Sequence, residues 1–305
     1  MKISTTFIFN VATAVAALLA LATPAHTAAL PGSSAPRIAT MPQPAPLEKR
    51  QLSGVNNFDC KLTPQHPRPL LLVHATLLTQ DSWWTFTPVL IREGYCVFAV
   101  TYGRYKNIPL VAGIGPVEDS AQEIGTFADQ ILSHYNVTQL DYVGHSQGGI
   151  LGRYWLKYLG GAGKVNRMVG ISPINHGTTL DGIATIAQAL RIFYPAQPIF
   201  DSFAPAFYEL VNTSEFMAKL NLGGDVGANV IHSNIATRFD EVVTPYQTCY
   251  QNDAGVTNTL LQDLCIFSIN EHLTMINSKV VLRWVMNQLD PANAKTSNCF
   301  AGLYL

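Results

Sequence analysis

A serine between two glycines is the feature of this sequence that most directly suggests chemistry. The run Gly144-His145-Ser146-Gln147-Gly148 fits the pattern G-x-S-x-G, a sharp strand-to-helix turn that exposes the serine hydroxyl. A strand-like run, residues 139–143, precedes it, and a helix-like run, residues 150–159, follows it. The two glycines avoid the collisions that side chains would cause in so tight a turn. The pattern therefore predicts that Ser146 is a nucleophile.

A serine nucleophile needs a base within hydrogen-bond reach and a carboxylate that orients this base. After such a turn, the acid and then the histidine follow the serine along the chain. Three histidines lie beyond the helix. His176 follows the next strand too soon to leave room for an acid-bearing strand, and His232 lies inside a predicted core strand. His272 lies in a predicted loop before the last helix, so we expect it to be the base.

Asp240 is the aspartate between Ser146 and His272 that directly follows a convincing strand. We therefore expect it to be the acid, with its neighbour Glu241 as the alternative. The negative oxygen that forms during acyl transfer needs backbone donors already in place. We expect the N–H groups of Gln147 and Thr76 to form this oxyanion hole, with the Thr76 hydroxyl as a further candidate donor.

Strands and helices that alternate along the chain must position these residues, and they predict an α/β fold. Such alternation is typical of a mostly parallel central sheet with helices on both faces. Strands are expected at residues 69–73, 95–101, 139–143, 165–171, 230–237 and, just before His272, 266–269. Helices are expected at residues 87–92, 117–135, 150–159 and 274–289.

A segment from about residue 181 to 221 interrupts this alternation. It is crowded with aromatic and aliphatic residues and broken by prolines 195, 198 and 205. Because it leaves the sheet where ligand sites of open sheets lie, we expect it to form an apolar cap over Ser146. The alternative is an ordinary packed excursion of the chain.

The first 50 residues are typical of a secreted precursor. Residues 1–28 have a short basic start, an apolar run and small residues, which is the layout of a signal peptide. Residues 29–50 are rich in Pro, Ala and Ser and end in Lys49-Arg50, which is typical of a propeptide cut site. The catalytic domain is then expected over residues 51–305. The alternatives are a membrane anchor and a harmless basic pair in a linker.

The remaining composition also suits an extracellular protein. Five cysteines follow residue 50, and in a secreted chain we expect disulfides, with Cys60 bonded to Cys96 and Cys249 to Cys265. Sequons at Asn136 and Asn212 predict glycosylation. The formal net charge of −1 gives no attraction for nucleic acid. We expect no metal site, because close Cys and His spacings are missing, and no stable membrane span.

Several motifs together resemble the secreted class 2 lipases of bacteria and fungi, which have the α/β-hydrolase fold. They are Leu72-Val-His-Ala-Thr76, Val143-Gly-His-Ser-Gln-Gly-Gly149, Ser172-Pro-Ile-Asn-His-Gly-Thr-Thr179, Phe239-Asp-Glu-Val-Val-Thr-Pro245 and Glu271-His272. The resemblance implies a Ser146–Asp240–His272 triad, an oxyanion pair from Thr76 and Gln147, no cofactor and carboxylic ester substrates. One departure is Ala75, where such lipases usually have glycine.

The function predicted from these features is that of a secreted triacylglycerol lipase, monomeric and acting on apolar esters at an oil–water interface. A carboxylesterase or polyesterase with the same residues is the alternative within the same chemistry. A binding protein that has lost turnover on the same scaffold is the alternative from another class, and a complete set of three catalytic residues disfavours it.

Overall fold

The computed structural model describes residues 52–105, 111–179, 181–186, 205–227 and 229–301 of the 305-residue chain. All of them belong to the unit Leu47–Leu305. The expected signal peptide and propeptide, residues 1–28 and 29–50, lie outside the described residues, and so do residues 187–204 of the expected cap.

Within these residues, six parallel strands form a sheet in the order β2-β1-β3-β4-β5-β6. The strands are β1 (Leu70–Val73), β2 (Val97–Val100), β3 (Leu140–His145), β4 (Val165–Ile171), β5 (Ile231–Ala236) and β6 (Thr257–Leu260). Every residue of β1 and β3 is buried, as expected for parallel strands covered on both faces. The predicted fold class is confirmed, and β1 to β5 overlap the predicted strands.

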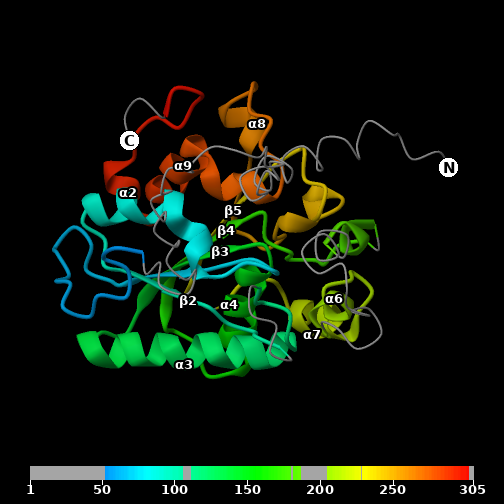
Figure 1. Cartoon of the computed structure of the whole chain (residues 1–305), viewed down its shortest axis with the longest axis horizontal. Helices are drawn as coiled ribbons and strands as arrows, with labels where there is room; N and C mark the ends of the chain where they lie inside the picture. Colours follow the sequence, from blue (N-terminus) through cyan, green and yellow to red (C-terminus); the bar gives the residue numbers. More distant parts are fainter. Residues whose placement is uncertain (1–51, 106–110, 180, 187–204, 228, 302–305) are drawn as a thin grey trace, which may run out of the picture. The chain divides into compact units, whose positions relative to one another are not determined.

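Helices cover both faces of this sheet (Figure 1). On one face lie α3 (Val117–Tyr135) and α4 (Gln147–Tyr158). On the other lie α2 (Thr87–Arg92), α9 (Lys279–Leu289) and the 3-10 helix η2 (Gln80–Thr85). Side chains of a strand alternate between faces, so Leu71 and Val73 of β1 pack in the α3 and α4 core. Leu70 and Leu72 pack in the core with α9.

Shorter helices lie along the connections between these elements. They are α6 (Pro205–Glu209), α7 (Glu215–Asn221), α8 (Leu261–Leu264), η3 (Tyr246–Cys249), η4 (Leu273–Asn277) and η5 (Pro291–Asn293). Helices α6 and α7 belong to the expected cap range, and α6 begins at Pro205, where a proline is tolerated. No helix among the described residues is long and apolar enough to cross a bilayer.

Near the C-terminus, one predicted strand is wrong and one predicted helix is shorter than expected. The last strand is β6 at residues 257–260, while residues 266–269 form a turn and an irregular stretch. As an edge strand, β6 pairs only with β5, so it can be polar, and its sequence Thr-Asn-Thr-Leu lacks the apolar run expected of a buried strand. The predicted helix at 274–289 is divided into η4 and α9, because Ser278 caps α9 by accepting the N–H of Val281.

The disulfide pairing is partly as predicted. Cys60 is bonded to Cys96, but Cys265 is bonded to Cys299, and Cys249 is a buried free thiol. The predicted Cys249–Cys265 bond is wrong because the sheet separates the two residues. Cys249 lies in the core beneath α3 and α4, whereas Cys265 lies in the core beneath α9, against which Cys299 packs.

Candidate active site

The predicted elbow is present, and its backbone is strained. Ser146 lies between the end of β3 and the start of α4 with φ 55° and ψ −122°, a conformation that L-residues seldom adopt and that clusters at functional sites. A Cβ on Gly144 would lie 2.5 Å from the carbonyl carbon of Gly148. A Cβ on Gly148 would collide with the Val73 carbonyl oxygen. The two glycines therefore let strand, turn and helix approach closely enough to form the elbow.

Asp240 and His272 meet directly, although they are 32 residues apart in the sequence. His272 Nδ1 lies 2.9 Å from Asp240 Oδ2, and both side chains are buried. The other carboxylate oxygen, Oδ1, accepts the N–H groups of Val242 at 3.1 Å and Val243 at 2.7 Å. Because the turn after β5 holds one oxygen in this way, the other oxygen is fixed toward the imidazole.

Two side chains hold the backbone of His272, a role that the sequence did not predict for either of them. Glu241 Oε2 accepts its N–H at 3.2 Å. The ring of His145 donates from Nε2 to its carbonyl oxygen at 3.1 Å, with the two rings 4.9 Å apart. Since His145 directly precedes Ser146, this contact brings His272 beside the elbow. Glu241, the alternative acid, positions the backbone of His272 and does not contact its ring. In the sequence, the only sign of these positioning roles is that His145 directly precedes Ser146 and Glu241 directly follows Asp240.

The electrostatics of the two histidines differ. Burial lowers the pKa of His272, but the charge and hydrogen bond of Asp240 outweigh it, so the net pKa is raised above 6.5. Burial holds the pKa of His145 well below 6.5. His145 is therefore neutral and carries one ring proton. A carbonyl oxygen can only accept, so this proton is on Nε2.

The two residues expected to form the oxyanion hole are neighbours. The Thr76 hydroxyl donates to Gln147 Oε1 at 3.0 Å, and the Tyr102 hydroxyl lies 3.3 Å from the same oxygen. Among the described residues, neither the Thr76 nor the Gln147 backbone N–H has an acceptor. Both N–H groups are thus available to a ligand, while the Thr76 hydroxyl, a candidate third donor, is engaged by Gln147.

Ala75 fits the loop before Thr76 without a strained backbone. The positive φ in this loop falls on Leu77, at 67°, and not on Ala75. A feature that the sequence did not reveal is Gly113, which lies against the loop with φ 67°. A Cβ there would lie 3.1 Å from Gln147 Oε1 and 3.2 Å from Thr76 Cα. The absence of a side chain at this position therefore leaves room for the Thr76–Gln147 contact.

The other two histidines beyond the elbow lie away from His272. His232 in β5 contacts Gln251 through Nδ1 at 3.1 Å, and burial lowers its pKa to about 4. His176 Nε2 lies 3.1 Å from Asp225 Oδ2. Asp225 also binds the guanidinium of Arg153, a buried residue of α4, at 3.0 Å. The described residues contain no group of three or more side chains that could hold a metal ion.

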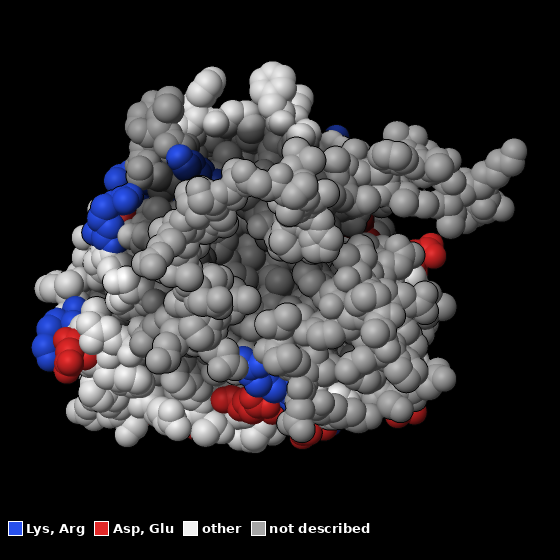
Figure 2. All heavy atoms as spheres, in the orientation of Figure 1, with Lys and Arg blue, Asp and Glu red and all other residues white. Residues whose placement is uncertain are grey.

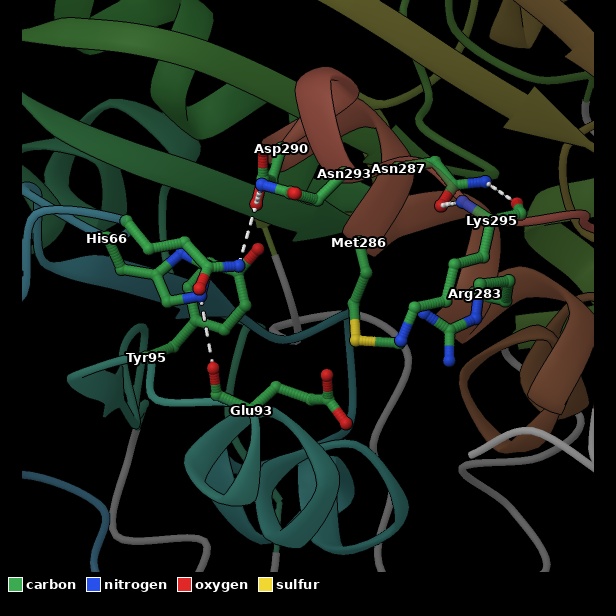
Figure 3. A pocket seen from close by; sticks show the side chains of 10 residues that line it. His66, Glu93, Tyr95, Arg283, Met286, Asn287, Asp290, Asn293 and Lys295 are labelled. Carbon is green, nitrogen blue, oxygen red and sulfur yellow. Dashed lines mark hydrogen bonds between the residues drawn. The ribbon is translucent and has the colours of Figure 1, made fainter.

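A further concavity lies near the N-terminal ends of β1 and β2 (Figure 3). Its polar groups bond to one another. His66 stacks on Tyr95 with ring centroids 3.7 Å apart and contacts the Glu93 carbonyl oxygen at 3.0 Å. Asp290 accepts hydrogen bonds from Asn293 and Gln65. This concavity is lined by no serine or cysteine, so it offers no nucleophile comparable to Ser146.

The expected glycosylation sites are exposed. Asn136 is the residue that ends α3, with φ 51°, and Asn212 follows α6 in a turn. On the face shown in Figure 2, the described charged side chains are scattered and form no continuous patch of either sign.

Comparisons with known proteins indicate the family and the fold of this chain. The family described as Lipase (class 2) matches residues 67–285, more than half of the chain. Among curated proteins, none matches the sequence significantly. The structure is similar to that of Aspergillus fumigatus lipase B, with a TM-score of 0.58 and 20% identity over 76% of this chain and 54% of that chain.

Two further solved structures are those of the lipase BlEst2 of Bacillus licheniformis. The mature form has a TM-score of 0.55 and 15% identity over 75% of this chain and 94% of that chain. The propeptide form has the same score and identity over 75% of this chain and 51% of that chain. This chain thus spans about half the length of the Aspergillus protein and of the propeptide form. The likeness establishes the α/β-hydrolase fold.

Proposed function

The chain belongs to the class 2 lipase family, and we propose that it is a secreted triacylglycerol lipase with a Ser–Asp–His acyl-enzyme mechanism. Membership of the family makes it a carboxylic ester hydrolase. The observation that best supports the proposed Ser–Asp–His mechanism is the 2.9 Å contact between His272 and Asp240, which lies beside the strained turn of Ser146.

In the proposed reaction, the Ser146 hydroxyl attacks the ester carbonyl carbon while neutral His272 accepts the hydroxyl proton at Nε2. Collapse of the tetrahedral intermediate breaks the bond to the alcohol oxygen, which takes the proton back from His272. Water then attacks the acyl-enzyme and gives a proton to His272. The carboxylic acid leaves as Ser146 regains its hydrogen.

Asp240 and the free backbone N–H groups have separate roles in this scheme. Asp240 accepts the Nδ1 proton of His272, so that Nε2 faces the serine, and it stabilises the imidazolium that forms. The N–H groups of Thr76 and Gln147 donate to the oxyanion, where preorganised donors contribute most to catalysis. Their lack of acceptors among the described residues supports this role. Glu241 and His145 position His272 through its backbone.

The proposed substrate is an apolar ester, and the segment from about residue 181 to 221 is proposed to cap the acyl group. The point where the segment leaves the sheet supports this role. Thr178, just before the segment, donates to the Val242 carbonyl oxygen at 2.6 Å, so the segment leaves the sheet beside the turn that holds Asp240. Phe207 in α6 and Leu210 just after it are buried, so this part of the segment packs into the fold, as the alternative of an ordinary packed excursion expects.

A substrate series with a Ser146→Ala control tests the function. We expect the wild-type enzyme to hydrolyse triglyceride emulsions and long-chain p-nitrophenyl esters. The Ser146→Ala variant should fold but lose at least about three orders of magnitude in kcat/KM, and a fluorophosphonate should label only the wild type. Near-normal hydrolysis by the variant would refute the mechanism. Turnover confined to short soluble esters would make the protein a carboxylesterase.

We also propose that residues 1–28 are a signal peptide, that residues 29–50 are a propeptide and that the secreted enzyme is a glycosylated monomer. The exposed positions of Asn136 and Asn212 and the two disulfides support an extracellular location. Intact-mass analysis of protein secreted by a fungal host should give a chain that starts at Gln51 and loses mass on endoglycosidase treatment. A chain that starts near Ala29 would contradict processing at Lys49-Arg50.

A further inference from the structure

The loop that leads to His272 exposes large apolar side chains. Ile266, Phe267 and Ile269 are 77%, 83% and 79% exposed, respectively. The loop follows α8, which lies at the top of Figure 1. Single exposed apolar residues are common on soluble proteins, but a contiguous group marks an interaction surface.

The polar groups of the same loop point inward and are hydrogen-bonded. Ser268 is buried, and its hydroxyl donates to Asn270 Oδ1 at 2.8 Å. Its carbonyl oxygen accepts from Gln262 Nε2 at 3.1 Å, and the Asn270 carbonyl oxygen accepts from the Thr237 hydroxyl at 2.7 Å. The Cys265–Cys299 disulfide closes the start of the loop. The loop is therefore held with its apolar side chains facing solvent, the reverse of an ordinary surface loop.

This surface adjoins the candidate active site along the chain. Leu273 directly follows His272 and is exposed. Phe239 directly precedes Asp240, is half-exposed, and forms a bridge with Glu271. We call Phe239, Ile266, Phe267, Ile269 and Leu273 the histidine-loop patch. Two of its members are thus sequence neighbours of the acid and of the base.

The charges of the loop favour a neutral partner. Residues 266–273 contain no lysine or arginine, and Arg238, which precedes Phe239, is a single exposed cation beside the patch. One cation is not the cluster of basic residues that binds anionic headgroups. Its one carboxylate, on Glu271, accepts the N–H of Leu273 at 2.8 Å. A polybasic segment would be expected at an anionic membrane, whereas apolar side chains without such a segment suit the surface of a neutral oil phase.

We propose that the histidine-loop patch is the surface by which this enzyme adsorbs to neutral lipid at an oil–water interface. Three exposed side chains enter the apolar phase, and the phase then faces the His272 side of the active site. The proposal rests on the proposed lipase function, since the adsorbed phase is also the substrate. It assigns adsorption to a rigid loop beside the catalytic base, separate from the cap segment.

Adsorption can be measured without turnover. In a Ser146→Ala background, protein mixed with a triolein emulsion is separated by flotation, and the bound fraction is compared among three proteins. These are the parent, a patch variant with Ile266→Ser, Phe267→Ser and Ile269→Ser, and a control with Leu222→Ser and Ile231→Ser. Both control residues are exposed. They lie at the opposite end of the sheet, because Ile231 begins β5 and the Leu222 carbonyl accepts from Lys157 near the end of α4.

We expect the patch variant to bind at least about tenfold more weakly than the parent, because burying each such side chain is favourable. The control should bind like the parent, and high salt should not weaken adsorption. With Ser146 restored, the patch variant should hydrolyse p-nitrophenyl acetate within about twofold of wild type.

Three results would overturn the proposal. They are unchanged adsorption of the patch variant, a parallel loss of soluble-ester hydrolysis, and a wild-type dimer in sedimentation that the patch substitutions dissociate. The last result would make the patch a contact between two copies of the chain. Absence of any esterase activity would refute the proposed function, but the flotation result would still test adsorption.

Discussion

The molecule contains two histidine–aspartate pairs that look alike in distance but differ in surroundings. His272 and Asp240 are 2.9 Å apart, and His176 and Asp225 are 3.1 Å apart. Each histidine lies on the carboxyl side of the sheet. Only the first pair lies beside the elbow, through the contact between His145 and the His272 carbonyl oxygen.

Apart from the histidine, the two carboxylates have different partners, and these partners account for the different surroundings of the two pairs. Asp240 accepts two backbone N–H groups, which orient it but leave its charge to the imidazole. Asp225 instead faces the buried guanidinium of Arg153 at 3.0 Å, which neutralises it. A histidine beside an aspartate is therefore not enough to indicate a base. The neighbours of the acid and the position of the serine decide the role.

The largest expected effect comes from removing the charge of each acid in turn. Asp240→Asn should lower kcat/KM by about three to four orders of magnitude, because the amide cannot hold the His272 tautomer that presents Nε2 to Ser146. Asp225→Asn should leave kcat/KM within a few-fold of wild type, because Asp225 contacts no residue of the elbow. The measurement is p-nitrophenyl ester hydrolysis at a temperature where circular dichroism shows both variants folded.

Glu241→Gln is a matched control for Asp240→Asn, since the amide oxygen can still accept the N–H of His272. The decrease in kcat/KM caused by Glu241→Gln should be much smaller than the decrease caused by Asp240→Asn. If Asp225→Asn and Asp240→Asn lost equal activity while folded, the His176–Asp225 pair would belong to the catalytic machinery. If Glu241→Gln were the more damaging change, the acid would be reassigned to Glu241.

The contact between His272 and Asp240 could be predicted because each residue carries a local signal. Asp240 follows a strand with an apolar pattern, and His272 precedes an amphipathic helix. The Arg153–Asp225 contact had no such signal. Arg153 lies within the apolar helix α4, and its partners Asn175, Asn221 and Asp225 come from two later segments. Their meeting depends on how these segments close over α4, which no local pattern encodes.

The failed predictions have the same kind of cause. A buried strand is visible as an apolar run, but the edge strand β6 satisfies its backbone through β5 and needs no such run. Residues 266–269 have the apolar composition of a buried strand, but Ile266, Phe267 and Ile269 face solvent. Cys249 and Cys265 are separated by the sheet, a separation that spacing in the sequence cannot show.

Protein stability at acidic pH should also distinguish the His176–Asp225 pair from the His272–Asp240 pair, although the expected effect is smaller. Burial raises the pKa of Asp225, but hydrogen bonds from His176 and Asn252 and the charge of Arg153 outweigh it, so the pKa falls from 3.8 to about 2. A folded-state pKa below the unfolded value stabilises the protein above pH 3.8. This contribution is lost as the pH falls from about 4 to about 2, and it amounts to about 2 kcal/mol.

Urea unfolding followed by tryptophan fluorescence, at about pH 5 and about pH 2.5, measures this contribution as the difference between the two unfolding free energies. Asp225→Asn should lower stability at the higher pH, because Arg153 is then buried without its counter-charge. It should also reduce the loss of unfolding free energy between these two pH values by about 1.5 kcal/mol, since part of the contribution remains at about pH 2.5. Asp129→Asn is the matched control, because Asp129 forms an exposed ion pair with Lys164 and such pairs contribute little. An acid-induced loss of stability in Asp225→Asn as large as in the control would mean that His176, Asn252 and Arg153 together do not stabilise the Asp225 charge in the folded protein.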